Sequence, residues 1–316
     1  MSKFLFAGAF LAAGVAFVFA IDKSVAPAPP MPVHMIVTVE ARHGGKVPAL
    51  KREDFMVAQP KDRFQVADAV ALTGSNAATE LYILIDEASN FTLASQLADL
   101  RRFIETQPAT TAVGIGYMHY GGVETLVEPT RDHDRAAKSL RLPMGLPSSP
   151  FLSLSELTKR WPEGTARRAV VMITSGVDPL GGTGPVDPYL DGAIADAQRA
   201  GIMISAIYTP SQGHAGHSYW RVYWGQNYIA ELADETGGEA YMLGFGPLVS
   251  FEPYLNEITE RMTHQYRLTL LTKPGAKPEL TPIKFSTEVP NAEIVAASKV
   301  YIPGNGLTPA ALPHAK

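Results

Sequence analysis

Apolar residues in the middle of the chain occur in short continuous runs. Each run ends in a polar or glycine-containing turn, which is typical of strands buried on both faces of a parallel sheet. The predicted strands cover residues 81–86, 111–120, 168–176, 202–208 and 239–243. Because segments with helical periodicity separate them, we expect a doubly wound, mainly parallel sheet with helices on both faces.

The segments between these runs carry helix start and stop signals. Ser149 suits an N-cap and is followed by Pro150, which suits the first helical position. Asp187 suits the N-cap of a later helix, and Gly201 suits its end. The predicted helices cover residues 91–108, 131–141, 149–161, 187–201, 227–238 and 251–263. Residues 123–129 are predicted as an edge strand.

Both flanks of this region show the alternating pattern of half-buried strands. We expect an N-terminal β module at residues 33–72, the α/β domain at residues 78–264, a C-terminal β segment at residues 265–303 and a tail at residues 304–316. Neither flank has enough strands for a stable core of its own. The two flanks are therefore predicted to pack together as one small β module.

The N-terminus is predicted to direct export. Residues 1–20 contain one early cation, Lys3, and then an uncharged apolar run, as in a secretory signal peptide cleaved after Ala20. An uncleaved membrane anchor is the alternative, because such a run can just span a bilayer. Residues 21–32 form a proline-rich linker. We therefore expect a periplasmic, cell-envelope or extracellular location.

Composition narrows the possible functions. The chain has 316 residues, of which 46% are hydrophobic and 18% charged, so it can bury a sizeable core. A net charge of −4 does not indicate binding to nucleic acid, which usually requires an excess of basic residues. The absence of cysteine excludes disulfides, thiolate nucleophiles, cysteine metal sites and lipoprotein attachment.

Three motifs of the α/β region resemble a known family. Residues 81–90 read LYILIDEASN, residues 169–178 read AVVMITSGVD, and residues 236–238 read TGG at the end of a helix. In this order they resemble a von Willebrand factor A (vWA) domain. The resemblance implies a doubly wound sheet with its binding site at the carboxyl ends of the strands.

The flanks extend the resemblance. An Asp-Phe pair at residues 54–55 and a Gln-Tyr pair at residues 265–266 are similar to those of the VWFA-related proteins of the acidobacterial type. The resemblance covers roughly residues 33–302 and implies a protein-binding module.

The resemblance also implies the position of a metal-ion-dependent adhesion site, but the residues depart from its pattern. Asp86 takes the first position of the Asp-x-Ser-x-Ser loop, whereas its two serines correspond to Ala88 and Asn90. The threonine of the second loop falls at residues 148–149, and the aspartate of the third falls on Ser175. Mg²⁺ and Ca²⁺ require several convergent oxygens. We therefore expect a degenerate site with Asp86 as its one weak ligand, and no bound cofactor.

Structural roles are the alternative for these residues. Asp86 would then accept backbone N–H groups at the top of the sheet, and Ser89 or Asn90 would cap the next helix. Asp178, three residues beyond Ser175, remains a further candidate for the binding surface.

A second candidate surface is a long predicted loop at residues 209–227 above the same sheet edge. Its candidate binding residues are Tyr219, Trp220, Arg221, Tyr223 and Trp224, and residues of these types often anchor interfaces. In the alternative, the tryptophans pack onto the sheet as a lid.

Histidines offer no clear catalytic or metal site. His214 and His217 would need further ligands for zinc, so we expect them to be solvated. His119 is predicted to be a hydrogen-bonded structural residue. Common hydrolase, metalloprotease and phosphate-loop motifs are absent from the sequence.

Three functions are compatible with these features. The first is an exported, non-enzymatic, adhesion-type module that binds a protein partner. The alternatives are a structural subunit of an envelope or extracellular assembly, as a homo- or hetero-oligomer, and an enzyme acting on envelope polysaccharide. No nucleic-acid partner is expected, and membrane contact is expected only through an uncleaved N-terminus.

Overall fold

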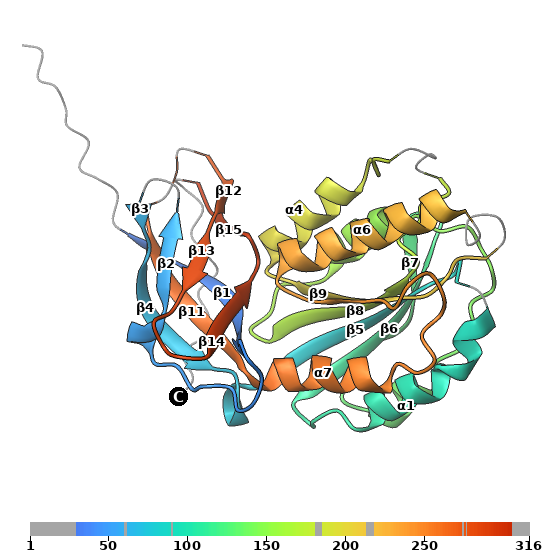
Figure 1. Ribbon diagram of the computed structural model, residues 1–316, viewed down its shortest axis with the longest axis horizontal. Coiled ribbons are helices and arrows are strands. Elements are labelled where there is room, and N and C mark those ends of the chain that lie inside the picture. The colour runs from blue at the N-terminus through green and yellow to red at the C-terminus, as the bar shows by residue number, and fades with distance from the viewer. Residues whose placement is uncertain are drawn as a thin grey trace, which may run out of the picture.

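The protein is described by a computed structural model. It describes residues 30–59, 62–89, 91–180, 185–212, 218–273, 275 and 277–304. These residues form an α/β domain and a smaller β module side by side (Figure 1). The predicted leader lies outside the described residues, as do most of the predicted linker and of the tail.

The α/β domain is built on a six-stranded sheet with the order β10-β9-β8-β5-β6-β7. The strands are β5 (Thr79–Asp86), β6 (Thr111–His119), β7 (Gly122–Thr130), β8 (Arg167–Thr174), β9 (Met203–Tyr208) and β10 (Ala240–Tyr241). All neighbours are parallel except β6 and β7. We call the edge at which the parallel strands end the carboxyl edge.

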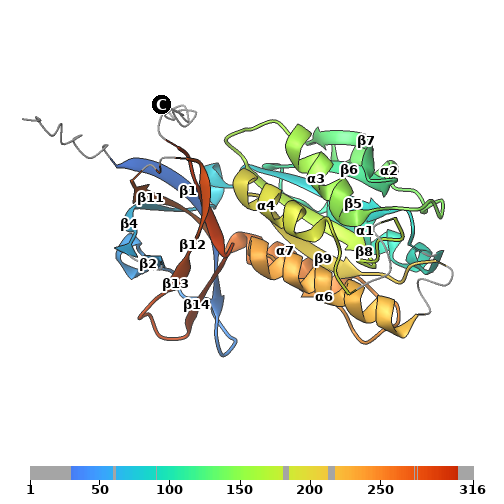
Figure 2. The same ribbon diagram turned by 90° about the horizontal axis from the view of Figure 1, so that it is seen from above.

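Helices cover both faces of this sheet because its strands are apolar on both sides. Ile83 and Ile85 of β5 belong to one core, and Tyr82 and Leu84 belong to the other. The first core includes residues of α1 (Leu97–Glu105), α2 (His133–Lys138) and α7 (Glu252–Thr263). The second includes residues of α3 (Pro150–Arg160), α4 (Leu190–Ala200) and α6 (Tyr219–Thr236), which lie in a row (Figure 2). The predicted doubly wound fold is confirmed.

The β module combines strands from both ends of the chain. Its sheets have the orders β14-β1-β11-β4, β13-β2-β3 and β12-β15. The strands are β1 (Met31–Ala41), β2 (Met56–Gln59), β3 (Asp62–Arg63), β4 (Gln65–Ala71), β11 (Gln265–Thr272), β12 (Glu279–Pro282), β13 (Lys284–Ser286), β14 (Ala292–Ala296) and β15 (Lys299–Ile302). β11 lies between β1 and β4, so the prediction that the flanks form one module is confirmed.

Polar contacts tie the two parts together. Gln265 at the start of β11 donates to Thr38 Oγ1 (3.1 Å) and accepts from Arg167 Nη1 (2.5 Å). Arg261 near the end of α7 forms ion pairs with Glu40 (2.5 Å) and Glu239 (3.3 Å). These contacts bring the amino end of the sheet against the module.

Two helix starts differ from the predictions. Asp187 does not cap α4, because its carboxylate accepts the N–H of Tyr189 (2.8 Å) in a turn that precedes the helix. Residues 91–95 form a 3₁₀ turn, and α1 follows at Leu97. Gly201 ends α4 in the left-handed conformation, as predicted.

Candidate functional site

Asp86 is the last residue of β5 and is fully buried at the middle of the carboxyl edge. Its Oδ1 accepts the N–H of Ala88 (2.8 Å) and the hydroxyl of Ser148. Its Oδ2 accepts the hydroxyl of Thr174 (2.7 Å), the last residue of β8. Three protein donors therefore surround the carboxylate.

Burial and hydrogen bonding act on the ionisation of Asp86 in opposite directions. Burial raises the pKa of the carboxyl above its ordinary value, and the neighbouring charge of Glu87 raises it further. The hydrogen bonds from Ser148, Thr174 and Ala88 oppose this rise without cancelling it. Asp86 is therefore a structural acceptor held by its neighbours.

These residues do not suit a hard cation. Ala88 has no side-chain ligand, and its carbonyl accepts the N–H of Gln212 (2.8 Å). The hydroxyl of Ser175 accepts the N–H of Val177 (3.2 Å). Mg²⁺ requires several available oxygens in near-octahedral geometry, and Ala88 and Ser175 do not supply the hydroxyl and the carboxylate that the resemblance implies at these positions. Asn90 lies outside the described residues.

Ser149 and Asp178 form a separate pair beside this network. Ser149 is at the N-cap position of α3, as predicted, but its hydroxyl does not cap the helix. It donates to Asp178 Oδ2, and Asp178 Oδ1 accepts the N–H of Leu180 (2.6 Å). Both side chains are buried. Because the Ser149 hydroxyl donates to Asp178, the expected capping role of this hydroxyl was wrong.

Helix α6 covers the loop that follows β8. A Cβ on Gly225 of α6 would lie 2.3 Å from the Ser175 carbonyl oxygen, and a Cβ on Gly176 would lie 2.2 Å from the Gly225 carbonyl oxygen. Gly176 also has φ of +67°, which favours glycine. Ser175 therefore lies beneath a helix backbone rather than at an open surface.

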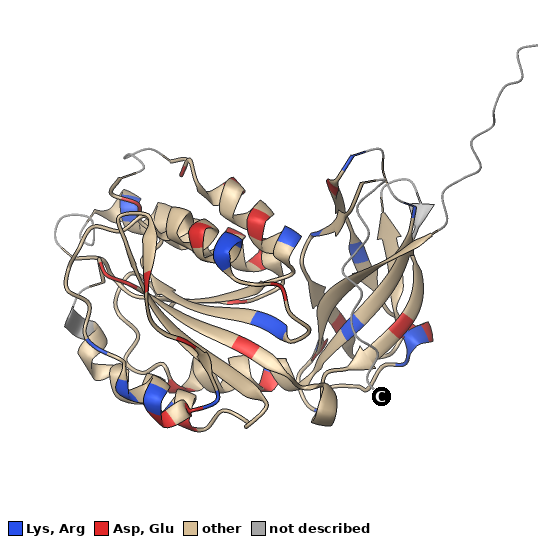
Figure 3. Ribbon diagram, turned by 180° about the vertical axis from the view of Figure 1, so that it is seen from behind, with Lys and Arg blue, Asp and Glu red and all other residues tan. Residues whose placement is uncertain are grey.

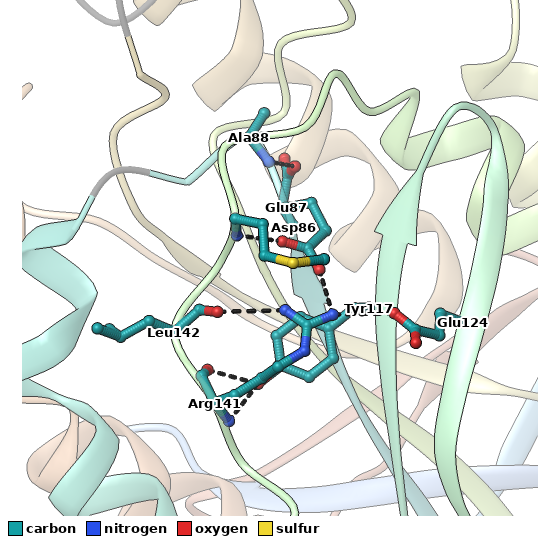
Figure 4. A network of polar contacts seen from close by, with 8 residues as sticks. Asp86, Glu87, Ala88, Tyr117, Glu124, Arg141 and Leu142 are labelled. Atoms are coloured by element: carbon teal, nitrogen blue, oxygen red, sulfur yellow. Dashed lines mark hydrogen bonds and ion pairs between the residues drawn. The ribbon is translucent and has the colours of Figure 1, made fainter.

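A polar network that sequence reasoning missed continues from Glu87, next to Asp86 (Figure 4). Buried Glu87 forms an ion pair with Arg141 (2.5 Å) and accepts the N–H of Met144 (2.5 Å). Arg141 also pairs with Glu124 (2.9 Å) and lies 4.0 Å from the ring centroid of Tyr117. The network anchors the segment before α3 to the sheet. Its only sequence signal was an acid directly after Asp86.

The aromatic residues at 219–224 lie on a helix, so the prediction of a loop through residue 227 was wrong. Helix α6 begins at Tyr219 and buries Val222, Gln226 and Ile229 at helical spacing. Glycine at position 225 permits close packing of this helix on the loop after β8. Helix α6 nevertheless begins at the carboxyl edge, beyond β9.

These side chains form an exposed aromatic cluster, which we define as Tyr219, Trp220, Tyr223, Trp224 and Phe245. The exposed fractions are 58% for Tyr219, 62% for Trp220, 44% for Tyr223 and 45% for Phe245. Tyr219 contacts the rings of Trp220 (5.4 Å), Tyr223 (6.5 Å) and Phe245 (5.1 Å) between centroids. Trp224 is half-buried beside Trp220. The tryptophans therefore do not form a lid on the sheet.

The remaining predicted positions are Arg221 and the histidines. Arg221 is half-buried on α6. His214 and His217 lie outside the described residues. His119 is half-buried, and its Nδ1 has no partner among the described groups, so the expected hydrogen bond of the ring stays a prediction for Nε2. Within the described residues, no group of three or more histidines and acids could hold a metal ion.

Comparisons with known proteins concern the fold. No family model matches the chain, and no curated protein matches its sequence. Among solved structures, it is similar to the ArnB paralog VWA2 from Sulfolobus acidocaldarius, with 9% identity, a TM-score of 0.40, and coverage of 86% of this chain and 76% of that one.

Two further solved structures are similar at comparable levels. For the human COPII-coat protein Sec24c the identity is 7%, the TM-score 0.43, and the coverage 72% of this chain and 44% of that one. For the SpRpn10 VWA domain the identity is 14%, the TM-score 0.38, and the coverage 57% of this chain and 95% of that one. The VWA2 paralog and the SpRpn10 domain are of the class that the sequence motifs resemble. The fold assignment itself rests on the strand order of this chain.

Proposed function

We propose that the chain is an exported, non-enzymatic module that binds a protein partner through the aromatic cluster and without a metal ion. The observation that carries the proposal is the exposure of Tyr219, Trp220 and Tyr223 on one helix at the carboxyl edge. Tyrosine and tryptophan dominate the binding energy of protein interfaces. Single exposed apolar residues need no explanation, but a contiguous group of them indicates a contact surface.

Rigid support of the cluster favours binding. Gln226 of α6 donates to the Gly244 carbonyl (2.6 Å), and Tyr208 at the end of β9 donates to the Phe245 carbonyl (3.4 Å). The contact of Gly225 with the loop after β8 fixes the helix itself. A backbone held in this way needs little rearrangement when a partner binds.

The acids of the carboxyl edge support a non-enzymatic role. Asp86 is held by three donors, Asp178 by Ser149 and Leu180, and Glu87 by Arg141. A general acid or base must reach a substrate proton, and these carboxylates face protein groups instead.

Export is part of the proposal and rests on residues 1–20 and the linker, which lie outside the described residues. The described helices include none with the length and hydropathy that a bilayer crossing requires. A module of this kind would be held away from the membrane by a stiff proline-rich linker, or released after cleavage.

We expect Mg²⁺ or Ca²⁺ at low millimolar concentration to leave the melting temperature unchanged. A ligand that binds only the folded state adds about 2.7 kcal/mol at a hundredfold excess over its Kd. Differential scanning fluorimetry with and without a chelator measures this. A metal-induced rise that disappears in Asp86→Ala would show that Asp86 is a working ligand and would contradict metal independence.

The binding proposal predicts that Trp220→Ser combined with Tyr223→Ser weakens partner binding about 30-fold or more, because each removes an exposed aromatic anchor. The measurement is capture from native envelope extract with the tagged full chain, followed by affinity determination for the captured protein. Val186→Ser, another exposed apolar position, is the matched control and should bind as the wild type does. Capture of a polysaccharide, or equal affinity in the double variant, would contradict the proposal.

A further inference from the structure

A groove of about 480 Å³ lies between the β module and the amino end of the α/β domain. One wall comes from β1 and β11, and the other from the start of β8, the end of α4 and residues 163–166. Residues of β15 complete it. The parallel strands begin here, so this site is separate from the carboxyl edge and does not depend on the aromatic cluster.

The groove has a pronounced excess of positive charge. Its basic lining residues are Arg167, Arg168, Arg199, Arg267 and Lys299. Glu163 is the only acid among the described residues that line it. Basic positions occur on both sides of the junction between the two parts (Figure 3). In a chain with net charge −4, this local reversal of sign indicates a site for an anion.

Most of these cations form no ion pair with a described acid, although the charges of Glu163 and Glu80 act on Arg168. Of the five, only Arg199 forms an ion pair with a described residue, Asp196 (2.9 Å). Arg167 is bound by neutral acceptors instead, Thr79 Oγ1 (2.6 Å) and the Met262 carbonyl (2.8 Å). A guanidinium that is largely removed from water without a carboxylate usually has an anionic partner or costs stability.

Burial is the main cause of two pKa shifts among the groups that line the groove. Burial lowers the pKa of Arg167 to about 10. Burial, reinforced by the charge of Arg267, lowers the pKa of His34. His34 and Arg267 lie two register positions apart on neighbouring strands, on the same face of the sheet. The groove thus disfavours further positive charge.

We propose that this groove binds a small ligand through an oxyanion group, a phosphate or a carboxylate, that Arg267 and Lys299 hold. Both side chains are half-buried, and neither forms an ion pair or side-chain hydrogen bond with a described residue. Guanidinium groups match the geometry of oxyanions. The volume lies in the range of small-molecule sites. Ile36 and Tyr301 in the lining provide apolar contact for the body of the ligand.

Isothermal titration calorimetry of the full chain with inorganic phosphate, pyrophosphate or citrate, at constant ionic strength set by sodium chloride, tests this proposal. Saturable binding is expected, and the preference between pyrophosphate and citrate tells a phosphoryl from a carboxylate ligand. Arg267→Gln combined with Lys299→Gln should weaken binding about tenfold or more. Arg131→Gln, which removes one positive charge from an exposed position after β7, should not.

A second measurement keeps the test decisive if the double variant does not fold. In the wild-type chain, the bound anion should raise the pKa of the His34 ring, measured by NMR. The ring signals of His133, whose ring nitrogen contacts the Thr111 carbonyl in the α/β domain (2.8 Å), should not move when the anion is added. Absence of saturable binding for all three anions, unchanged affinity in the double variant, or an unchanged His34 titration would overturn the proposal.

Discussion

Gly225→Ala should destabilise the protein by about 3 kcal/mol, which is at the upper end of the cost of overpacking. The added methyl would lie 2.3 Å from the Ser175 carbonyl oxygen, a distance that no rotamer change can relieve because both atoms belong to the backbone framework. Helix α6 must therefore move away from the loop after β8. Urea denaturation followed by circular dichroism measures the loss, and partner binding should weaken because the aromatic cluster moves with the helix.

Gly192→Ala is the matched control for this prediction. Gly192 lies within α4, and a Cβ there would meet no atom within 4 Å. Alanine should therefore stabilise the chain by about 1 kcal/mol through helix propensity alone. The same substitution is thus expected to have opposite signs in two helices. Equal effects at Gly225 and Gly192 would disprove the close contact of α6 with the sheet edge.

Asp86→Ala should also cost about 3 kcal/mol, although no metal is involved. The hydroxyls of Ser148 and Thr174 and the N–H of Ala88 would lose their acceptor in a fully buried environment. Each unsatisfied buried donor costs about 1–3 kcal/mol, and removal of a buried charge returns part of the total. Asp134→Ala, at an exposed position on α2, should change stability by less than about 0.5 kcal/mol.

The pH dependence of stability separates the charge of Asp86 from its hydrogen bonds. Burial raises its pKa in the folded chain above the ordinary 3.8, so the folded state holds the proton more tightly than the unfolded state. The stability from this proton is fully present below the unfolded pKa and is lost as the pH rises through the folded pKa. In Asp86→Asn this loss is absent, so the stability difference from wild type should shrink over the pH range above the ordinary carboxyl pKa of 3.8. A constant difference over that range would contradict a raised pKa.

The fold could be predicted from the sequence because one kind of signal repeats along it. Apolar runs such as residues 81–86 and 168–176 are removed from water when they form strands buried on both faces. The periodic segments between them form the helices that cover these faces. The pairing of the flanks followed from their small size. What the pattern did not contain was the order of strands in the module, since alternation identifies a strand without identifying its neighbour.

The site was harder to predict because its contacts join residues far apart in the chain. Asp86 was identified from its position after an apolar run, but its hydroxyl donor at Thr174 reads as an ordinary strand residue. Ser149 appeared to be a cap, and only the structure shows that its hydroxyl binds Asp178. The aromatic residues at 219–224 were expected in a loop, whereas they lie on the first turns of α6.

The position of β11 between β1 and β4 has a consequence for the order of folding. During synthesis, β11 emerges about 190 residues after the end of β4, when the whole α/β domain has already been made. Until then β1 and β4 have unpaired edges, which favour association with other chains. The α/β domain can fold before β11 is available to complete the sheet of the β module. A chain that stops near the end of α7 therefore leaves β1 and β4 without their shared partner strand. Pairing of the strands after α7, beginning with β11, is the last step in the assembly of the protein.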